Sequence, residues 1–403
     1  MSERNGIAKS RDFLLACVAV LVGLCAALLL LEVLLRFLPV NSGLRMHAVS
    51  AAQPILHFEP NRNYVFSRGW DFSIVNTGHV NNFGFVNDED YVPESHTPLI
   101  AVIGDSFIEA VMVPFPETVQ GRLSAAVRAK GVGRVYSFGS SGSPLSQYLA
   151  YATFARDNFQ PDGLVIAVIS NDFDESLLKY KNDPGFHYFA ESAEGELSLT
   201  RVDYEPSLLR RVSRYSALAR YVATNMYLLE SWGRVAREAG KSAASKYVGN
   251  VEAHVDPLRL RDSEHTVIAF LDRLPEGAGL PASRILFLVD GIRPNLYSDD
   301  GLQEARGSYF DHMRQYFIDQ AKRRGYLTED LQIRFIARHR ADGSRFEFAT
   351  DGHWNGTGHA VAAEAVMESE LFRTVFGDLA GTAARHYERD SQSSRAMMSA
   401  TTR

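Results

Sequence analysis

The chain has 403 residues, of which 46% are hydrophobic and 22% charged, and its formal net charge is −6 at pH 7. This composition excludes a fibrous or largely disordered chain, and a negative charge without a basic stripe argues against nucleic-acid binding. The length provides for one large domain or two small ones with an ample core. The function must therefore be sought in local motifs.

The first forty residues differ from the rest. Phe13 to Leu31 form an uncharged apolar run that is long enough to cross the core of a bilayer. Basic residues precede this run, so the positive-inside rule places residues 1–12 in the cytoplasm. These basic residues are Arg4, Lys9 and Arg11. We predict a transmembrane signal anchor over residues 13–39 in a bacterial inner membrane, with the remaining chain outside the cytoplasm.

A cleaved signal peptide is the alternative interpretation of this segment. The apolar region of a signal peptide is usually shorter, and no small-x-small cleavage site follows Leu31. Residues 40–97 show no strong helical period, and their alternating stretches around 64–66 and 72–75 are typical of short strands. We predict a spacer with edge elements that pack on the domain that follows.

From Leu99 onward, apolar runs alternate with amphipathic helical stretches. The predicted strands are 99–103, 135–138, 164–169 and 285–289, with a weaker fifth at 333–336. The predicted helices include 116–127, 145–156 and 360–371. Short runs without polar positions are typical of parallel strands that are buried on both faces. The alternation predicts a three-layer α/β/α domain with a parallel sheet over residues 98–376.

A long stretch between about residues 176 and 283 interrupts this alternation. Helical patterns around 208–236 and 259–274 lie within it. Because the stretch is far too long for a connection, we predict an inserted, mainly helical subdomain. The apolar content falls after Phe376, and residues 377–403 are predicted to form a disordered tail.

Four polar stations follow predicted strands or precede the last helix. They are Gly104-Asp105-Ser106, Gly139-Ser140-Ser141-Gly142, Ser170-Asn171-Asp172 and Asp351-Gly352-His353. Open α/β sheets place their ligands at the carboxyl ends of the strands. The four stations are therefore expected to meet at one edge of the sheet.

The residue types at these stations suit nucleophilic catalysis at an ester. A serine is a weak nucleophile until a general base removes its proton and a carboxylate orients that base. We predict Ser106 as the nucleophile, His353 as the base and Asp351 as the orienting acid. The backbone N–H groups of Ser106 and Gly142 and the side-chain amide of Asn171 are the expected donors to the oxyanion.

Taken in this order, the four stations resemble the four blocks of the SGNH (GDSL-type) hydrolase superfamily. The resemblance covers about residues 81–371 without the insert and implies a flavodoxin-like three-layer fold. It also implies a set of roles: nucleophile Ser106, oxyanion glycine Gly142 with Gly139 as the fallback, oxyanion asparagine Asn171, acid Asp351 and base His353.

The chain departs from the family pattern at two places. Ile169 stands where the third block usually has a glycine, and the last block is Asp-x-His where Asp-x-x-His is usual. The form Asp-x-His-Trp is similar to that of membrane-associated SGNH proteins that acetylate bacterial exopolysaccharides such as alginate. In those proteins, however, the Asp-x-His precedes the serine.

Several further residues have weaker assignments. Asp105 and Asp172 are expected to tie the loops together, Gly139 and Trp354 to support the site, and Asp342 is a rival to Asp351 as the acid. The remaining histidines show no spacing that indicates a metal. They include His187, His254, His265, His312, His339 and His359. No glycine-rich nucleotide motif follows a strand, so no cofactor is predicted.

The prediction is thus a membrane-anchored, serine-dependent ester hydrolase or O-acyltransferase that forms an acyl-serine intermediate. Anchoring and the resemblance favour an O-acylated cell-envelope or exported carbohydrate as the substrate. The alternative is a catalytically silent scaffold of the same fold that binds glycans or assists assembly. A thioesterase or lipid-directed hydrolase is a third possibility.

Overall fold

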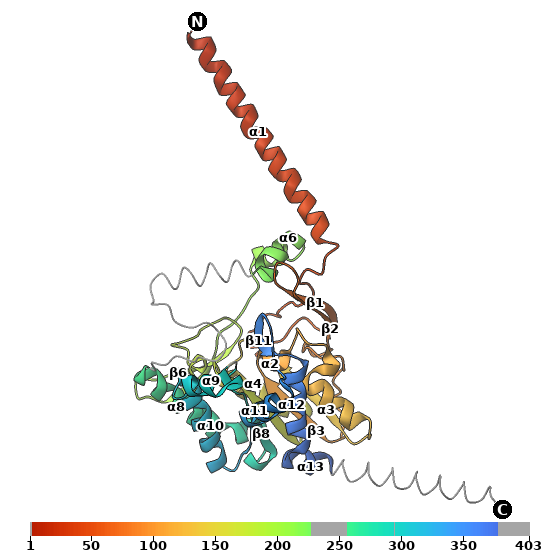
Figure 1. The fold of residues 1–403 in the computed structure, drawn as a ribbon, viewed down its shortest axis with the longest axis vertical. Helices are drawn as coiled ribbons and strands as arrows, with labels where there is room; N and C mark the ends of the chain where they lie inside the picture. Colours follow the sequence, from red (N-terminus) through yellow and green to blue (C-terminus); the bar gives the residue numbers. More distant parts are fainter. Residues whose placement is uncertain (1, 227–255, 294, 378–403) are drawn as a thin grey trace, which may run out of the picture. The chain divides into compact units, whose positions relative to one another are not determined.

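The structure is a computed structural model that describes residues 2–226, 256–293 and 295–377 (Figure 1). Its helices are α1 (Ser2–Leu35), α2 (Ser106–Glu109), α3 (Val119–Arg128), α4 (Leu145–Phe159), α5 (Leu208–Ser213), α6 (Ala217–Arg220), α8 (Pro257–Ala278), α9 (Asp299–Ala305), α10 (Tyr309–Arg323), α11 (Leu331–Asp342), α12 (Gly356–Glu368) and α13 (Glu370–Phe376). Its strands are β1 (Arg62–Arg68), β2 (Ile74–Val80), β3 (Leu99–Gly104), β4 (Arg134–Gly139), β5 (Gly163–Val168), β6 (His187–Glu191), β7 (Leu197–Arg201), β8 (Ile285–Val289), β9 (Leu327–Asp330), β10 (Glu347–Phe348) and β11 (Asp351–Trp354).

The chain divides into two compact units. The smaller unit comprises the described parts of Met1–Leu44, Asn63–Thr77 and Pro206–Ala243. The larger unit comprises the described parts of Arg45–Arg62, Gly78–Glu205 and Ala244–Arg403. The central sheet and all four polar stations belong to the larger unit.

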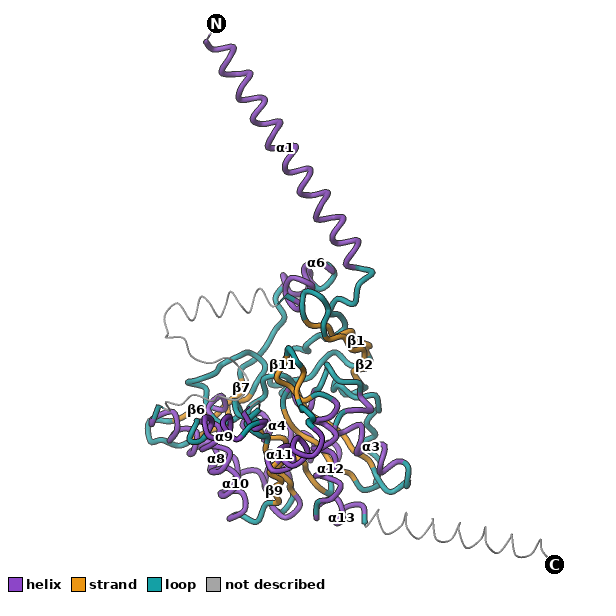
Figure 2. Tube along the Cα trace, viewed as in Figure 1, coloured by secondary structure: helices purple, strands orange, loops and turns teal. Residues whose placement is uncertain are grey.

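The central sheet of the larger unit is parallel, with the strand order β4-β3-β5-β8-β9 in the described residues. Figure 2 shows the strands in orange and the helices in purple. Gly104 is paired with Gly139, and Ile103 is paired with Ile166, so β3, β4 and β5 end close to one level. After β3 the chain adds β4 on one side of it and then β5 on the other, so the direction in which strands are added reverses beside β3. Such a switch point is where doubly wound sheets bind their ligands. The predicted flavodoxin-like α/β fold is confirmed.

Two apolar layers cover the sheet because successive side chains of a strand point to opposite faces. Leu99, Ala101 and Ile103 of β3 pack with residues of α4, α8 and α10. Ile100 and Val102 pack on the other side with residues of α3, α11, α12 and α13. Every residue of β3, β5 and β8 is buried. This burial explains why these strands appear in the sequence as continuous apolar runs.

The predicted fifth strand at 333–336 is wrong. These residues lie in α11, and the fifth strand is β9, which ends just before that helix. Alternating Ile333 and Phe335 suggested a strand, but Ile333 is 67% exposed. Leu331 and Phe335, four residues apart, are both buried. The apolar period is therefore helical, and the side chain of Asp330 begins the helix by accepting from the backbone N–H of Gln332 at 3.1 Å.

The stretch predicted as a mainly helical insert also differs from the expectation. It contains the antiparallel hairpin of β6 and β7 before its helices. Its last helix, α8, contributes Val267 and Phe270 to the core layer beneath the sheet and is thus part of the α/β domain. The predicted helix at 208–236 is divided into α5, α6 and a π-helical turn (Tyr221–Asn225), and its remainder lies outside the described residues.

The segment directly before the first strand of the sheet belongs to the larger unit, and its residues contact β4. The ring of Tyr91 stacks on that of Tyr136, with 4.0 Å between ring centroids, and its hydroxyl donates to the backbone carbonyl of Ser137 at 2.7 Å. Asn87 also donates to the Ser137 hydroxyl at 3.0 Å. These contacts fix the segment on β4. The predicted tail, apart from Gly377, lies outside the described residues.

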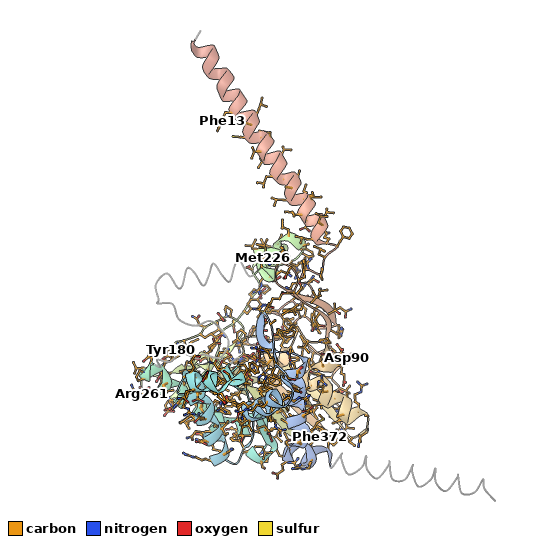
Figure 3. All side chains as sticks on the ribbon, viewed as in Figure 1. Phe13, Asp90, Tyr180, Met226, Arg261 and Phe372 are labelled. Carbon is orange, nitrogen blue, oxygen red and sulfur yellow. The ribbon has the colours of Figure 1, made fainter. Side chains whose placement is uncertain are left out.

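The smaller unit begins with the long helix α1. A stretch of 18 residues within Phe13–Leu35 has a mean hydropathy of 3.0 and none of that stretch is buried, so by length and composition the segment could cross a membrane, or serve as a signal sequence. Phe13 is 72% exposed, and Figure 3 shows side chains standing out along this helix. The hairpin of β1 and β2 belongs largely to the same unit, and β1 includes the predicted stretch 64–66. Of the stretch 72–75, only Ile74 and Val75 lie in β2.

Candidate active site

Ser106 lies at the first position of α2, directly after β3. The side chain of Asp105 caps this short helix and accepts from the backbone N–H of Phe107 at 2.9 Å. The cap fixes the turn between strand and helix. The turn therefore holds Ser106 at the carboxyl end of β3, beside the switch point of the sheet.

Asp351 and His353 lie on β11, which pairs with β10 as a short antiparallel hairpin. Residues two apart on a strand point to the same face, so the tight Asp-x-His spacing brings both side chains together. Oδ1 of Asp351 accepts from the backbone N–H of His353 at 2.9 Å and also bonds to ring Nδ1 of His353. The strand geometry explains how Asp351 and His353 bond to each other with one residue fewer between them than in the usual Asp-x-x-His spacing.

The imidazole of His353 connects the hairpin to Ser106. Nε2 of His353 lies 2.7 Å from Oγ of Ser106. Because Nδ1 faces the carboxylate of Asp351, the neutral ring carries its proton there and Nε2 accepts from the serine hydroxyl. Oγ of Ser106 also lies 3.4 Å from the Asp105 carboxylate, which is the longer contact. The Asp351 side chain is 1% exposed and that of His353 is 16% exposed.

The turn after β4 carries the two candidate oxyanion glycines. Gly142 has a φ of +82°, a conformation that favours glycine. Gly139 lies at the end of β4, where a Cβ would come within 2.9 Å of the backbone nitrogen of Glu109. Glu109 also holds the turn, because its carboxylate accepts from the backbone N–H of Ser141 at 2.7 Å and bonds to the Ser141 hydroxyl. The helix that begins with Ser106 is thus joined to the turn that contains Gly142.

Asn171 is connected to the same turn through two charged side chains. Its amide donates to Oε2 of Glu175 at 3.1 Å. Nζ of Lys181 lies 2.7 Å from the same oxygen and donates to the backbone carbonyl of Gly142 at 2.9 Å. A side-chain amide has two N–H donors, so Asn171 can hold Glu175 and offer the second to a ligand. Hydrogen bonds thus link the stations after β4 and β5.

Residues after β8 support the histidine hairpin. The indole of Trp354 donates to Oδ1 of Asp290 at 2.9 Å, and Arg293 pairs with the same carboxylate at 2.5 Å. Arg293 also donates to the backbone carbonyl of Gly352 at 2.8 Å, and its guanidinium lies over the ring of Phe107. The side chain of Arg293 is 1% exposed. These contacts hold both sides of the Ser106–His353 pair.

Sequence reasoning missed Asp290, Arg293, Glu109 and Lys181. A signal for the first two was present, because they directly follow the predicted strand 285–289 as the other stations follow theirs. Glu109 and Lys181 belong to no motif. Their contacts join residues that are 32 and 39 positions apart in the chain, which no local pattern reveals.

Asp105 and Asp172 do not bond to each other among the contacts of the described residues. Asp172 accepts from the backbone N–H of Ile169 at 2.7 Å and from the hydroxyl of Tyr148 at 3.0 Å. Each aspartate thus braces its own turn. Burial raises the pKa of Asp105 to about 6 and raises that of Asp172 well above its usual range, with the Asp105 charge adding to the second shift.

The rival acid Asp342 lies at the end of α11, where it pairs with Arg338 at 2.6 Å and not with His353. His359 is buried, and its Nδ1 accepts from the backbone N–H of Val119 at 3.2 Å. Burial lowers the pKa of His359 to about 3. Across the described ranges, no group of three or more His, Cys, Asp or Glu side chains is placed to hold a metal ion.

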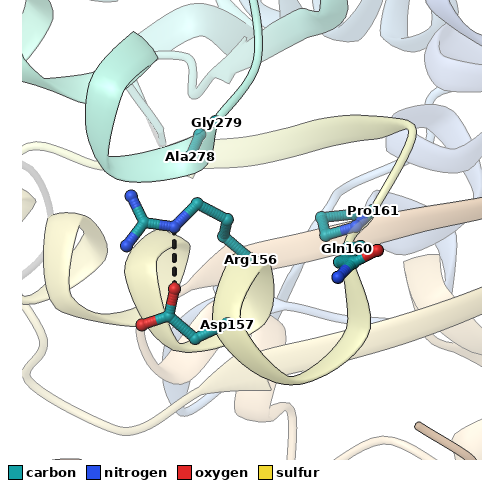
Figure 4. A pocket seen from close by; sticks show the side chains of 6 residues that line it. All are labelled: Arg156, Asp157, Gln160, Pro161, Ala278 and Gly279. Carbon is teal, nitrogen blue, oxygen red and sulfur yellow. Dashed lines mark hydrogen bonds and ion pairs between the residues drawn. The ribbon is translucent and has the colours of Figure 1, made fainter. Parts of the chain in front are cut away.

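A separate pocket lies between the ends of α4 and α8 (Figure 4). Its lining residues are Arg156, Asp157, Gln160, Pro161, Ala278 and Gly279. Gln160 and Pro161 directly precede β5, so this pocket is at the amino end of the strand. It therefore lies at the opposite edge of the sheet from Ser106.

Glu109 leads to a prediction about stability and pH. Burial raises its pKa to about 7 from an ordinary value of 4.5, so the folded state favours the neutral form. Its contribution to stability is therefore fully present below pH 4.5 and is lost as the pH rises through 7. For the shift of Glu109 this loss is about 3 kcal/mol. The side chain of Glu109→Gln does not titrate. As the pH rises from 4.5 to 8, we therefore expect the wild type to lose stability relative to this variant by that amount.

The measurement is urea unfolding of the full chain in detergent at several pH values. Glu194→Gln, at an exposed position in the turn between β6 and β7, is the matched control and should follow the wild type. A difference between Glu109→Gln and the wild type that stays constant with pH would contradict the prediction.

The chain was compared with known proteins. No family model matches it, and no curated protein matches it. Solved structures similar to it include a lipase/acylhydrolase from Enterococcus faecalis, with 12% identity, a TM-score of 0.36, and coverage of 69% of this chain and 97% of that one. A member of the lipolytic G-D-S-L family from Veillonella parvula has 11% identity, a TM-score of 0.35 and coverage of 68% and 98%.

An acetyl xylan esterase is similar at 12% identity, with a TM-score of 0.37 and coverage of 66% of this chain and 97% of that one. These sequence identities and TM-scores describe a likeness and assign no activity to the chain. The strand order and the contacts of the four stations are properties of the chain itself.

Proposed function

We propose that the chain is a serine-dependent ester hydrolase or O-acyltransferase. The observation that carries the proposal is the connected set of Ser106, His353 and Asp351 at the switch point of the sheet, with 2.7 Å between Nε2 of His353 and Oγ of Ser106. A serine, a histidine that can accept its proton and a buried carboxylate on the other ring nitrogen are the groups that nucleophilic acyl transfer requires.

The reaction has two halves. Oγ of Ser106 attacks the ester carbonyl while its proton moves to Nε2 of His353. The tetrahedral intermediate then collapses, the bond to the alcohol oxygen breaks, and His353 gives its proton to that oxygen. In the second half His353 takes a proton from water or from another hydroxyl, whose oxygen attacks the acyl-serine. The second tetrahedral intermediate then collapses, the bond between the acyl carbon and Oγ of Ser106 breaks, and His353 returns its proton to Oγ. The products are a carboxylic acid or a new ester, and Ser106 is regenerated.

Charge develops on the carbonyl oxygen in both halves. The donors proposed for it are the backbone N–H groups of Ser106 and Gly142 and the side chain of Asn171. Support for this set comes from the hydrogen-bonded chain of Asn171, Glu175, Lys181 and the Gly142 carbonyl. Donors that are held in place before the reaction stabilise an oxyanion without the cost of reorganisation.

The proposed substrate is an O-acylated carbohydrate of the cell envelope or an exported polysaccharide. This part of the proposal is supported by α1, whose segment Phe13–Leu35 could anchor the chain, and by the basic residues that precede it in the sequence. With the amino terminus in the cytoplasm, the site would face the envelope of a bacterial cell. The Asp-x-His-Trp form of β11 is similar to that of the membrane-associated acetylating proteins.

The proposal is tested by incubating the full chain in detergent with an O-acetylated oligosaccharide. Hydrolysis releases acetate, and transfer moves acetyl to an added free oligosaccharide, so the two branches are measured in one assay. Ser106→Ala should abolish both products, while Ser198→Ala on exposed β7 should retain them. A parallel assay with an acyl thioester separates the thioesterase alternative. Turnover of none of these esters by the wild type would favour the scaffold and contradict the proposal.

Asn171 gives a graded prediction for the same assay. Removing one oxyanion donor typically lowers kcat by about 10²–10³, so Asn171→Ala should show that loss with a much smaller change in KM. Asn158→Ala is the matched control because Asn158 donates to the Phe154 carbonyl near the far end of α4. A loss confined to KM would contradict a role of Asn171 in stabilising the oxyanion.

A further inference from the structure

In the smaller unit, residues after α5 are bonded to the carboxyl end of α1. The carboxylate of Glu32 accepts from the hydroxyl of Ser216 at 2.8 Å and from the backbone N–H of Leu218 at 2.9 Å. Arg36 pairs with Glu32 at 2.9 Å, and Leu35 packs in a buried cluster with Ala217. The segment from α5 to α6 is thus attached at the point where the apolar helix ends, and α6 lies beside that end in Figure 1.

The tip of the β1–β2 hairpin joins the same cluster. The hydroxyl of Tyr221 donates to the backbone carbonyl of Trp70 at 2.7 Å, and its ring lies 5.6 Å from that of Phe72. The side-chain amide of Asn225 donates to the hydroxyl of Ser67 at 2.6 Å. Two segments far apart in the sequence therefore gather around the end of α1.

Large apolar side chains of these segments and of the residues just after α1 are exposed. We call these residues the collar: Phe37, Trp70, Leu208, Leu209, Val212 and Tyr215. Their exposed fractions range from 60% at Val212 to 83% at Phe37. Exposed apolar residues gathered in one unit indicate an interaction surface. Phe37 lies just after the end of α1, and Arg36 donates to the backbone carbonyl of Tyr215 at 3.4 Å. These two collar residues therefore continue from the apolar segment of the helix.

The part of the collar that follows Pro206 lies in a basic segment, while the exposed Asp71 stands next to Trp70 in the hairpin tip. Between Pro206 and Met226 the sequence has four arginines and no acidic residue. Arg210 and Arg211 are exposed, and the guanidinium of Arg214 lies 5.1 Å from the ring centroid of Tyr215. Apolar side chains mixed with arginines are typical of segments that lie at the surface of an anionic membrane. Tryptophan and tyrosine also favour the level of the lipid headgroups.

We propose that the collar is a lipid-binding surface that lies in the headgroup region of an anionic bilayer. The occupant is inferred from the charge and from the continuity of the collar with Phe13–Leu35, and the inference rests on the proposal that this segment anchors the chain. Leu208, Leu209 and Val212 would enter the boundary of the acyl chains, and the arginines would contact lipid phosphates. The smaller unit would then be attached to the membrane both by α1 and by its surface.

The test places an environment-sensitive fluorophore on the collar of the full chain. Cys17 and Cys25 are replaced by alanine, and a single cysteine is introduced as Leu209→Cys or Val212→Cys for labelling with NBD. Ile333→Cys, on the exposed face of α11 in the larger unit, is the matched control. Each protein is reconstituted in nanodiscs of phosphatidylcholine with or without phosphatidylglycerol, and circular dichroism verifies its folding.

In discs that contain phosphatidylglycerol, the label at 209 or 212 should emit at shorter wavelength than at 333. Iodide should quench it severalfold less, and a quencher carried on the lipids should reach it. Replacing Arg210, Arg211 and Arg214 by glutamine should remove the difference between the two lipid compositions. The proposal is overturned if iodide quenches 209, 212 and 333 equally in chains that co-elute with the discs. It is also overturned if the label is shielded from both quenchers, which would indicate a protein partner.

Failure of this experiment is distinguishable from failure of the proposed ester chemistry. The readout depends on residues of the smaller unit, whereas the ester assay depends on Ser106 in the larger unit. A chain that does not enter the discs would contradict the anchor and the collar together and would leave the ester assay unaffected.

Discussion

His353→Ala is expected to lower kcat for ester turnover by a factor on the order of 10⁵–10⁶. The substitution removes the group that lies 2.7 Å from Oγ of Ser106 and that we propose as its general base. Without this base the hydroxyl stays protonated at neutral pH and attacks poorly. KM should change little, because the imidazole acts on the serine and not on the remote parts of the substrate.

The control for this prediction is His312→Ala. His312 lies on α10, where Nε2 is 2.8 Å from the carboxylate of Glu264, and its side chain is 42% exposed. Its replacement should leave kcat near that of the wild type. A His353→Ala enzyme that retains wild-type kcat would show that another group is the base.

Asp351→Asn is expected to lower kcat by a factor on the order of 10⁴ while leaving the fold intact. The carboxylate of Asp351 accepts a hydrogen bond from Nδ1–H of His353, which leaves Nε2 able to accept from Ser106. An amide in its place can present an N–H to Nδ1 and favour the other tautomer, in which Nε2 carries the proton and cannot take one from the serine.

Asp342→Asn is the matched control because Asp342 is the rival acid weighed from the sequence. It is an exposed residue that pairs with Arg338 at 2.6 Å. Its replacement should leave kcat unchanged. If Asp342→Asn showed the large loss and Asp351→Asn did not, the assignment of the acid to Asp351 would be wrong.

The sheet could be predicted because its strands are buried on both faces. Strand β5 (Gly163–Val168) has no polar side chain at any position, and the polar residues Ser170, Asn171 and Asp172 come soon after it. The prediction of a fifth strand at 333–336 was wrong because the alternation of apolar residues there is too short to distinguish a strand from a helix. Only the burial of Leu331 and Phe335, with Ile333 exposed, distinguishes the two periods.

The residues with proposed catalytic roles were identifiable because they follow strands or form a recognisable pattern near the last helix. The residues that hold these side chains in place were harder to identify from the sequence. Glu109 occupies the end of a four-residue helix and resembles a surface glutamate in the sequence, yet it is 4% exposed and bonded to Ser141. Lys181 and Glu175 form their pair within the stretch predicted as an insert, at positions that carry no motif. Long-range contacts of this kind depend on the completed fold.

The short Asp-x-His spacing could be interpreted only after the structure was known. On a helix, residues two apart face different directions, whereas on β11 Asp351 and His353 share one face. The sequence shows the spacing but not the two-residue strand β10 that turns this segment into a hairpin.

The most direct test of the central claim is to locate the site of covalent reaction. The wild-type chain is treated with a serine-directed fluorophosphonate, and the modified peptide is identified by mass spectrometry. The account predicts one adduct on Ser106, no adduct in Ser106→Ala, and much slower labelling of His353→Ala. An adduct on another residue, or equal labelling of the wild type and Ser106→Ala, would contradict Ser106 as the nucleophile.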